Sequence, residues 1–171
     1  MLFTSGTTGG PKGVVLSYRA ISARMENTSE GNGLKETDVM LLPLPLGHSF
    51  GMRVLRACIH TGATIVLQNG FTFARDTQRS IDIFGCTAMA AVPASLGVME
   101  LQMKKQLPEI LGKLRYIEFG AGSLSPQKKR ELMESLPNTE IHNTWGSTET
   151  GGAVFLNLAK NPEKYQSIGK P

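Results

Sequence analysis

One stretch of this 171-residue chain governs the interpretation of the rest: Thr4-Ser5-Gly6-Thr7-Thr8-Gly9-Gly10-Pro11-Lys12-Gly13. Four hydroxyl side chains, four glycines and one lysine fall within these ten residues. Glycines let consecutive backbone amides point at one anion, hydroxyls add further donors, and the lysine supplies a positive charge. The composition therefore predicts a loop that holds a polyphosphate. The alternative is a mobile loop without a ligand.

This stretch differs from the Walker P-loop, which requires Gly-x-x-x-x-Gly-Lys-Ser/Thr. Counted from Gly6, Pro11 stands where the second glycine belongs. Gly13 then replaces the hydroxyl residue that would hold magnesium. The motif therefore argues against a P-loop kinase or GTPase.

Short apolar runs alternate with amphipathic stretches along the chain. The expected strands are 14–16, 39–42, 64–67, 87–92, 116–119 and 140–143, and the expected helices lie near 18–28, 50–60, 73–84, 94–103 and 126–136. The last helix has the clearest start, because Ser125 can cap its free amides and Pro126 suits the first helical position. Strands that alternate with helices predict a layered α/β fold with a mostly parallel sheet and flanking helices. Such sheets bind ligands beyond the carboxyl ends of their strands.

Composition places the chain among ordinary globular proteins, with 40% hydrophobic and 19% charged residues. No apolar run approaches the roughly 20 residues that a membrane-spanning helix needs, so no membrane span is expected and the cytoplasm is the expected location. Cys58 and Cys86 lack CxxC spacing and, like His60 and His142, are given structural roles. Met99 and Met103 fall at helical spacing, which favours core packing.

The net charge of +4 does not indicate a nucleic-acid partner. The basic run Lys128-Lys129-Arg130 is followed by Glu131 and Glu134. Such mixed charge is typical of the solvated face of a helix, and few aromatic residues are interleaved with it.

Residues 3–14, read as Phe-Thr-Ser-Gly-Thr-Thr-Gly-Gly-Pro-Lys-Gly-Val, resemble the signature of the adenylate-forming superfamily. That superfamily comprises acyl- and aryl-CoA synthetases, firefly-luciferase-like enzymes and adenylation domains of peptide synthetases. Further segments resemble family motifs in family order, namely 43–52, 119–124, 143–149 and 167–171. The resemblance implies that residues 1–171 are part of an AMP-binding (adenylation) domain within the large N-terminal domain. The family's ribose-binding aspartate motif and its small C-terminal domain, which carries a lysine, have no counterpart here, so a fragment is expected.

The resemblance also implies roles for individual residues. The β- and γ-phosphates of ATP would be held by Thr4, Ser5, Gly6, Thr7, Thr8, Gly9 and Lys12. The adenine and the acyl group would lie against the backbone of Gly120, Ala121 and Gly122, and the adenine would also lie near Trp145 and Gly146. Thr148 would donate to the α-phosphate, and Glu149 would hold Mg²⁺. His48 would orient the acyl carboxylate or gate its pocket. The implied catalytic residues are thus Thr148, Glu149, His48 and Lys12.

The implied reaction activates a small carboxylic acid with ATP as an acyl-adenylate, releases pyrophosphate and transfers the acyl group to a thiol. Coenzyme A is the leading acceptor, and a carrier-protein thiol is the alternative. No aspartate occurs in 46–52, where peptide-synthetase domains would hold a substrate amino group. Val92-Pro93 either approaches the substrate or merely ends a strand. The isolated chain is expected to be inactive, and a non-catalytic nucleotide-binding fragment remains the third possibility.

Overall fold

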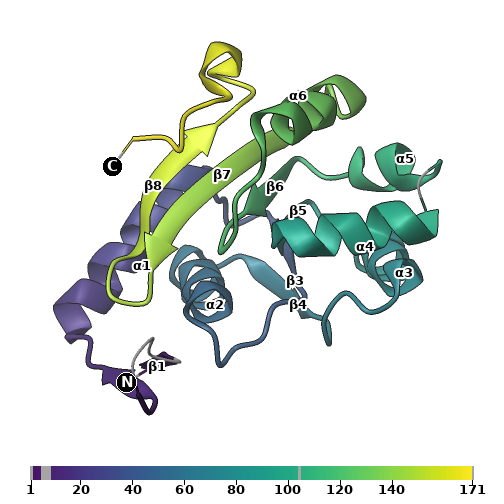
Figure 1. Cartoon of the computed structure of the whole chain (residues 1–171). Helices are drawn as coiled ribbons and strands as arrows, with labels where there is room; N and C mark the ends of the chain where they lie inside the picture. Colours follow the sequence, from purple (N-terminus) through teal and green to yellow (C-terminus); the bar gives the residue numbers. More distant parts are fainter. Residues whose placement is uncertain (1, 5–8, 104, 171) are drawn as a thin grey trace.

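The computed structural model describes residues 2–4, 9–103 and 105–170. Within these residues a six-stranded sheet forms the centre, in the order β4-β3-β5-β6-β7-β8 (Figure 1). The strands are β3 (Val39–Leu42), β4 (Thr64–Leu67), β5 (Ala88–Ala91), β6 (Tyr116–Phe119), β7 (Glu140–Ser147) and β8 (Gly151–Asn157). The pairs from β4 through β7 are parallel, and β8 pairs antiparallel with β7. The predicted layered α/β fold with a mostly parallel sheet is confirmed.

The strand order reverses at β3. The chain places β4 on one side of β3 and then β5, β6 and β7 in succession on the other side. The loops that leave β3 and β5 therefore diverge at the carboxyl end of the sheet, which is where ligands bind in open α/β folds. This reversal fixes where a site is to be sought.

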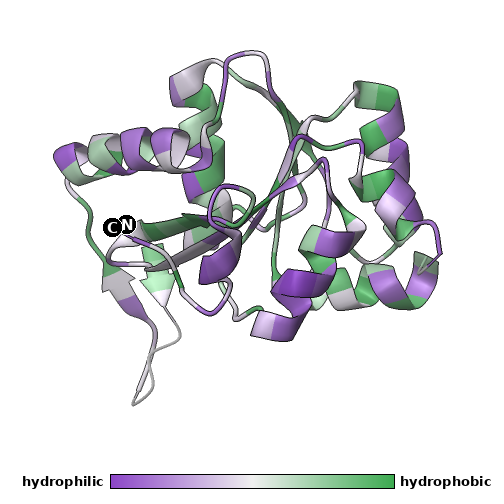
Figure 2. Cartoon of the chain, turned by 90° about the horizontal axis from the view of Figure 1, so that it is seen from above, coloured by the Kyte–Doolittle hydropathy of each residue, from purple (hydrophilic) through white to green (hydrophobic). Residues whose placement is uncertain are grey.

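Helices cover both faces of the sheet (Figure 1). One layer contains α1 (Tyr18–Asn32) and α2 (Ser49–Thr61), and the other contains α3 (Ala74–Phe84), α4 (Pro93–Met103), α5 (Leu107–Leu111) and α6 (Pro126–Ser135). Because side chains alternate along a strand, Met40 and Leu42 join the cluster under α2, whereas Leu41 joins the cluster under α3 to α6. Figure 2 shows hydrophobic central strands between helices that carry both kinds of residue.

Most of the residues that were given structural roles lie in this core, whereas His60, in the last turn of α2, is exposed. Cys58 and Cys86 are buried in different clusters, and burial raises the pKa of Cys58 to about 12. Met99 is buried, and Met103 packs against the same cluster. His142 is buried between Asn32 and Glu140, at 3.2 and 2.9 Å from their side-chain oxygens. Burial or core packing confirms the structural interpretation of Cys58, Cys86, Met99, Met103 and His142. No helix in the described ranges is long and apolar enough to span a membrane.

The structure corrects the expected elements in several places. The strand expected at 14–16 is wrong, because Lys12–Val14 (β2) pairs with Leu2–Thr4 (β1) as a separate antiparallel hairpin. Strand β8, helix α5 and a 3₁₀ turn at Pro162–Lys164 were not predicted. Strand β7 continues to Ser147 rather than ending at 143, because β8 supplies hydrogen-bonding partners along its whole second half. Trp145 and Gly146 therefore lie on a strand and not in a loop.

Candidate functional site

Two cavities open beyond the carboxyl ends of the parallel strands. The polar cavity, of about 540 Å³, is lined by His48, Ser49, residues 121–124, Lys129, residues 143–149 and Ile168. The apolar cavity, of about 810 Å³, is lined by residues 43–45, His48, Phe50, Phe71, Thr72, residues 92–95, Val98, Ala121 and Gly122. His48, Ala121 and Gly122 line both cavities, so the two meet at these residues.

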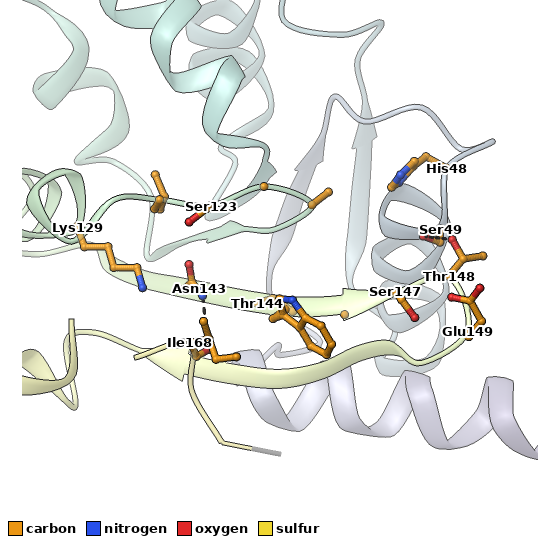
Figure 3. A pocket seen from close by; sticks show the side chains of 15 residues that line it. His48, Ser49, Ser123, Lys129, Asn143, Thr144, Ser147, Thr148, Glu149 and Ile168 are labelled. Atoms are coloured by element: carbon orange, nitrogen blue, oxygen red, sulfur yellow. Dashed lines mark hydrogen bonds between the residues drawn. The ribbon is translucent and has the colours of Figure 1, made fainter. Parts of the chain in front are cut away.

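The polar cavity has two chemically different ends (Figure 3). Thr148 and Glu149, on the turn between β7 and β8, lie at one end together with His48. Lys129 of α6 and Asn143 of β7 lie at the other end. The wall between these ends is formed by Trp145 and Gly146 of β7 and by the loop that follows β6.

The turn that carries Thr148 and Glu149 is held by two helices. The Thr148 hydroxyl donates to Ser49 Oγ at the start of α2, at 3.3 Å. Arg24 of α1 donates to the backbone carbonyl oxygens of Thr148, at 3.4 Å, and of Glu149. Within the turn, Ser147 and Thr150 exchange hydrogen bonds through their hydroxyls and backbone amides. Arg24 was not expected at the site, because it lies 124 residues before Thr148 in the chain.

Glu149 is suited to a hard cation. Its side chain is exposed, and a hydrogen bond from Ser147, together with the charge of Arg24, lowers the pKa of its carboxyl. An ionised carboxylate is a preferred ligand of Mg²⁺, so the residue expected to hold Mg²⁺ has the chemistry for it. Gly146 is required by the backbone here, because an added Cβ would lie 1.5 Å from the carbonyl oxygen of Gly151.

His48 occupies the junction of the cavities and also caps α2. Its Nδ1 accepts a hydrogen bond from the Phe50 amide at 3.2 Å, which orients the ring. Since Nδ1 serves as the acceptor, the neutral ring carries its proton on Nε2, which is left for a ligand. The side chain is exposed. The structure thus gives His48 a capping role in addition to its expected place beside the acyl pocket.

The loop after β6 is shaped by close packing. A Cβ at Gly120 would lie 3.0 Å from the Phe50 ring, and one at Gly122 would lie 3.1 Å from Pro93. Between them Ala121 has φ of 55°, a left-handed conformation that side-chain-bearing residues adopt at a cost. The loop therefore forms a thin, fixed wall between the two cavities. Val92 and Pro93 also line the apolar cavity, so the strand end approaches that space.

The predicted phosphate loop is described only at its two ends. Thr4 pairs with Lys12 in the β1–β2 hairpin, and Gly9 is exposed before β2. Ser5, Gly6, Thr7 and Thr8 lie outside the described residues. Neither cavity is lined by Thr4, Gly9 or Lys12. Leu2 of the same hairpin lines a small cavity with Ser49 and Gly151, next to the Thr148-Glu149 turn. The phosphate-binding role of the loop stays a prediction.

Lys129 is the main residue of the polar cavity that sequence reasoning missed. The basic run was interpreted as a solvated helix face, and this is wrong for Lys129, which is only 4% exposed and lines the polar cavity. Its neighbour Lys128 does lie outside and pairs with Glu100 and Glu131. The signal was available in the helix period, because 129 lies three residues before the buried Leu132 and shares its face.

The site is thus defined by a polar and an apolar cavity that lie side by side at the strand ends of a mostly parallel sheet. A family model described as "AMP-binding enzyme" matches residues 1–171, and the chain belongs to this family. The resemblance inferred from the motifs is thereby confirmed.

Similar curated proteins are CoA ligases. The chain is 30% identical over 183 residues to 4-coumarate--CoA ligase-like 5 of Oryza sativa subsp. japonica, covering 99% of this chain and 33% of that protein. It is 31% identical over 177 residues to the sulfoacetate--CoA ligase of Cupriavidus necator, covering 100% of this chain and 33% of that protein. The chain thus spans about a third of the length of these relatives.

Solved structures agree with this assignment. O-succinylbenzoate coenzyme A synthetase from Bacillus subtilis, in complex with ATP and magnesium ion, superposes with a TM-score of 0.82 at 29% identity, covering 99% of this chain and 34% of that one. The same enzyme in complex with its acyl-adenylate intermediate gives a TM-score of 0.84 at 30% identity, covering 99% and 43%. The fold is therefore that of part of the N-terminal domain of adenylate-forming enzymes.

Proposed function

We propose that this chain is the ATP-binding core of a larger acid–thiol ligase that activates a carboxylic acid as an acyl-adenylate. The observation that carries the proposal is the meeting of the polar and apolar cavities at His48, Ala121 and Gly122. An adenylating enzyme must bring a polar nucleotide and an organic acid together at one point, and these cavities provide that arrangement. Membership of the AMP-binding family supports the same conclusion.

In the first half-reaction an oxygen of the substrate carboxylate bonds to the α-phosphorus of ATP, and the bond from that phosphorus to pyrophosphate breaks. Both reactants are anionic, so the site must align them and offset their charge. Thr148 would donate its hydroxyl to the α-phosphate, and Glu149 would hold the metal. Mg²⁺, when bound, would neutralise part of the negative charge on the phosphates. Thr4 to Gly9 and Lys12 would hold the β- and γ-phosphates.

His48 would bind the acyl carboxylate at the junction of the two cavities. Its Nδ1 is engaged by the Phe50 amide, so the Nε2 proton is the one that would be donated to the carboxylate oxygen. A fixed ring at this point would align the carboxylate with the α-phosphorus and leave the remainder of the acid in the apolar cavity.

The lining of the apolar cavity favours an acid with an uncharged, apolar body. Apart from His48, the described residues that line it carry no titratable group. A second carboxylate or a sulfonate placed there would lose its hydration without gaining a cationic partner. We therefore place the substrate with uncharged aromatic or aliphatic acids rather than with acids that bear a second negative charge.

In the second half-reaction a thiol sulfur would bond to the acyl carbonyl carbon as AMP leaves. Coenzyme A is the proposed acceptor, because the relatives named above are CoA ligases. A carrier-protein thiol is the alternative, and release of AMP that depends on free coenzyme A separates the two. The proposal also assigns the ribose-binding aspartate and the catalytic lysine to parts of the enzyme beyond residues 1–171, so residues 1–171 alone would be inactive.

Calorimetric titration of residues 1–171 with magnesium-ATP, beside a Glu149→Gln variant, tests the nucleotide site. Saturable binding that weakens in the variant is expected, with circular dichroism used to check that both proteins are folded. If a folded wild-type chain binds magnesium-ATP no better than the variant does, the assigned role of Glu149 is wrong.

A further inference from the structure

Lys129 is a buried cation without an anionic partner in the described chain. Its side chain is 4% exposed, and its one hydrogen bond there is from Nζ to the carbonyl oxygen of Ser167, at 2.8 Å. A lysine ammonium carries three N–H donors, so two of them are not used by described residues. The ion pairs within the described ranges do not include Lys129, although Lys128 beside it forms two.

This position is unfavourable for a positive charge in the absence of a ligand. Lys129 lies in the first turn of α6, where the helix dipole is positive and acidic side chains are preferred. Burial also removes water from the ammonium, and this lowers the pKa of Lys129. A neutral side chain of similar length would pack here at smaller cost. The charge is therefore best explained by something it binds inside the cavity.

The unused donors face the end of the polar cavity that lies opposite Glu149 (Figure 3). Ser123, Asn143 and Ile168 line the same end. Asn143 donates its amide N–H to the Ile168 carbonyl oxygen at 3.5 Å, which leaves the side-chain oxygen of Asn143 as an acceptor. A donor and an acceptor thus lie at the same end of the cavity.

A nucleotide in this cavity would place its base at that end. The phosphates belong near Thr148 and Glu149, and the base and phosphates are the two ends of the same molecule. Adenine carries acceptor ring nitrogens next to a donating exocyclic amino group on its polar edges. That pattern is complementary to the ammonium of Lys129 and the amide oxygen of Asn143.

We propose that Lys129 recognises the base of the bound nucleotide, with its ammonium donating to an acceptor ring nitrogen of adenine. This inference rests on the proposed function, since it takes the ligand of the polar cavity to be ATP. Lys129 is then a binding and specificity residue that does not touch the reacting phosphorus. The hydrogen bond to Ser167 holds the side chain in place and uses one donor, and the base uses another.

The alternative is that Lys129 has a purely structural role and connects α6 to the segment around Ser167 through its hydrogen bond. Loss of a structural contact would affect folding and every kinetic constant together, whereas loss of base recognition would affect nucleotide affinity alone. The two roles also differ in their dependence on the base, because a structural contact does not depend on whether the base has a given ring nitrogen.

The test compares Lys129→Met with Lys128→Met in the enzyme that contains this chain. Both changes remove one lysine from adjacent positions of α6, but Lys128 is ion-paired on the outside. Calorimetric dissociation constants for ATP are measured first, because they do not require turnover. Lys129→Met is expected to weaken ATP binding about tenfold or more, which is the scale of a hydrogen bond from a charged group, and Lys128→Met is expected to leave it unchanged.

Analogues of ATP in which ring N1 or ring N7 is replaced by CH identify the contact. Replacing the ring nitrogen that Lys129 binds should weaken nucleotide binding by the wild type. The factor should equal that by which Lys129→Met weakens the binding of ATP. The variant should then not distinguish the analogue from ATP. Lys129→Gln, which keeps an N–H donor on a side chain one bond shorter, should recover part of the affinity and guards against a variant that fails to fold.

Unchanged ATP affinity in a folded Lys129→Met enzyme would overturn the inference. The inference would also be overturned if, for each analogue, the ratio of its affinity to that of ATP were the same in the wild type and the variant. Wild-type enzyme that binds no adenine nucleotide would overturn the inference and the proposed function together. Wild-type enzyme that binds ATP but fails to form acyl-adenylates would contradict the proposed function alone, since the affinity ratios still decide the role of Lys129.

Discussion

Arg53 and Glu118 form a buried ion pair, with 2.5 Å between Arg53 Nη2 and Glu118 Oε1. The pair lies beneath two segments that line the polar cavity, the loop after β6 and the second half of β7. Glu118 is two residues before Gly120, and the hydroxyl of Thr144, next to Trp145, donates to the same Glu118 oxygen at 2.6 Å. Arg53 also donates to the Thr28 hydroxyl of α1, at 3.1 Å. One charged pair therefore ties α1, α2, β6 and β7 together below the site.

Removing one member of this pair should be costly. Glu118→Ala would leave the Arg53 guanidinium buried without its counter-charge, and we expect a loss of about 3–5 kcal/mol in the free energy of unfolding. Urea denaturation of wild type and variant measures it. Glu100→Ala, which breaks a partly exposed pair with Lys128, is the control and should cost less than about 1 kcal/mol. Equal effects of the two changes would contradict this interpretation of the pair.

Arg24 should govern nucleotide affinity through the Thr148-Glu149 turn. Arg24→Ala removes the two hydrogen bonds that tie this turn to α1. We expect magnesium-ATP to bind about tenfold more weakly, measured by calorimetry, with little change in the unfolding midpoint. Arg19→Ala, at an exposed position of the same helix, should bind ATP like the wild type. A folded Arg24→Ala protein with wild-type affinity would show that the turn does not need this anchor.

The carboxyl of Asp38 should make the free energy of unfolding decrease at acidic pH. Burial raises the pKa of its carboxyl, but hydrogen bonds from Arg115, the Lys35 amide and Thr87 outweigh this, so the pKa falls below its ordinary value of 3.8. As the pH falls towards 3.8, the Asp38 carboxyl is therefore protonated in the unfolded chain before it is protonated in the folded chain. The stabilisation is present above about pH 4 and is lost as the pH falls through the lowered pKa.

Unfolding free energies measured between pH 2 and pH 6 test the role of Asp38. Wild type should lose stability towards the acid end, and Asp38→Asn should be less stable at pH 6 and show a smaller further loss. A variant with the same acid dependence as the wild type would place the responsible carboxyl elsewhere.

The apolar cavity should reject acids that carry a second negative charge. In the enzyme that contains this chain, Val98→Arg would place a cation in the lining of that cavity. We expect kcat/KM for an uncharged aromatic or aliphatic acid to fall about tenfold or more, and the preference to shift towards dicarboxylic acids. Val98→Met, which adds volume without charge, is the control. A wild-type preference for dicarboxylic acids would contradict the assignment of substrate class.

Local patterns were sufficient to predict the central sheet but not its edge. Strands such as 39–42 and 116–119 are short apolar runs between helices, and the sheet they form is the expected one. Strand β8 was missed because glycines at 151 and 152 weaken the local strand signal, and pairing with β7 is what makes the segment a strand. The hairpin of β1 and β2 likewise depends on pairing between segments on either side of the glycine-rich loop.

The candidate site likewise contains some residues that were predicted from sequence and others that were not. Thr148, Glu149 and His48 were identified from motifs, and the structure brings them to one end of the polar cavity. Arg24 could not be identified from sequence, because its contact with the turn exists only after α1 packs beside β8. Lys129 lay in a run of three basic residues, and only the helix phase set by Leu132 distinguishes its inward direction.

Exchange of labelled pyrophosphate into ATP, measured with and without a carboxylic acid substrate, tests the central claim most directly. The enzyme that contains this chain should catalyse exchange only when a suitable apolar carboxylic acid is present, and Glu149→Gln should reduce the rate by about a hundredfold or more, the scale seen when one transition-state contact is removed. A folded enzyme that binds magnesium-ATP but shows no exchange with a panel of aromatic and aliphatic acids would contradict the account. Exchange at an undiminished rate in Glu149→Gln would contradict the site assigned to it.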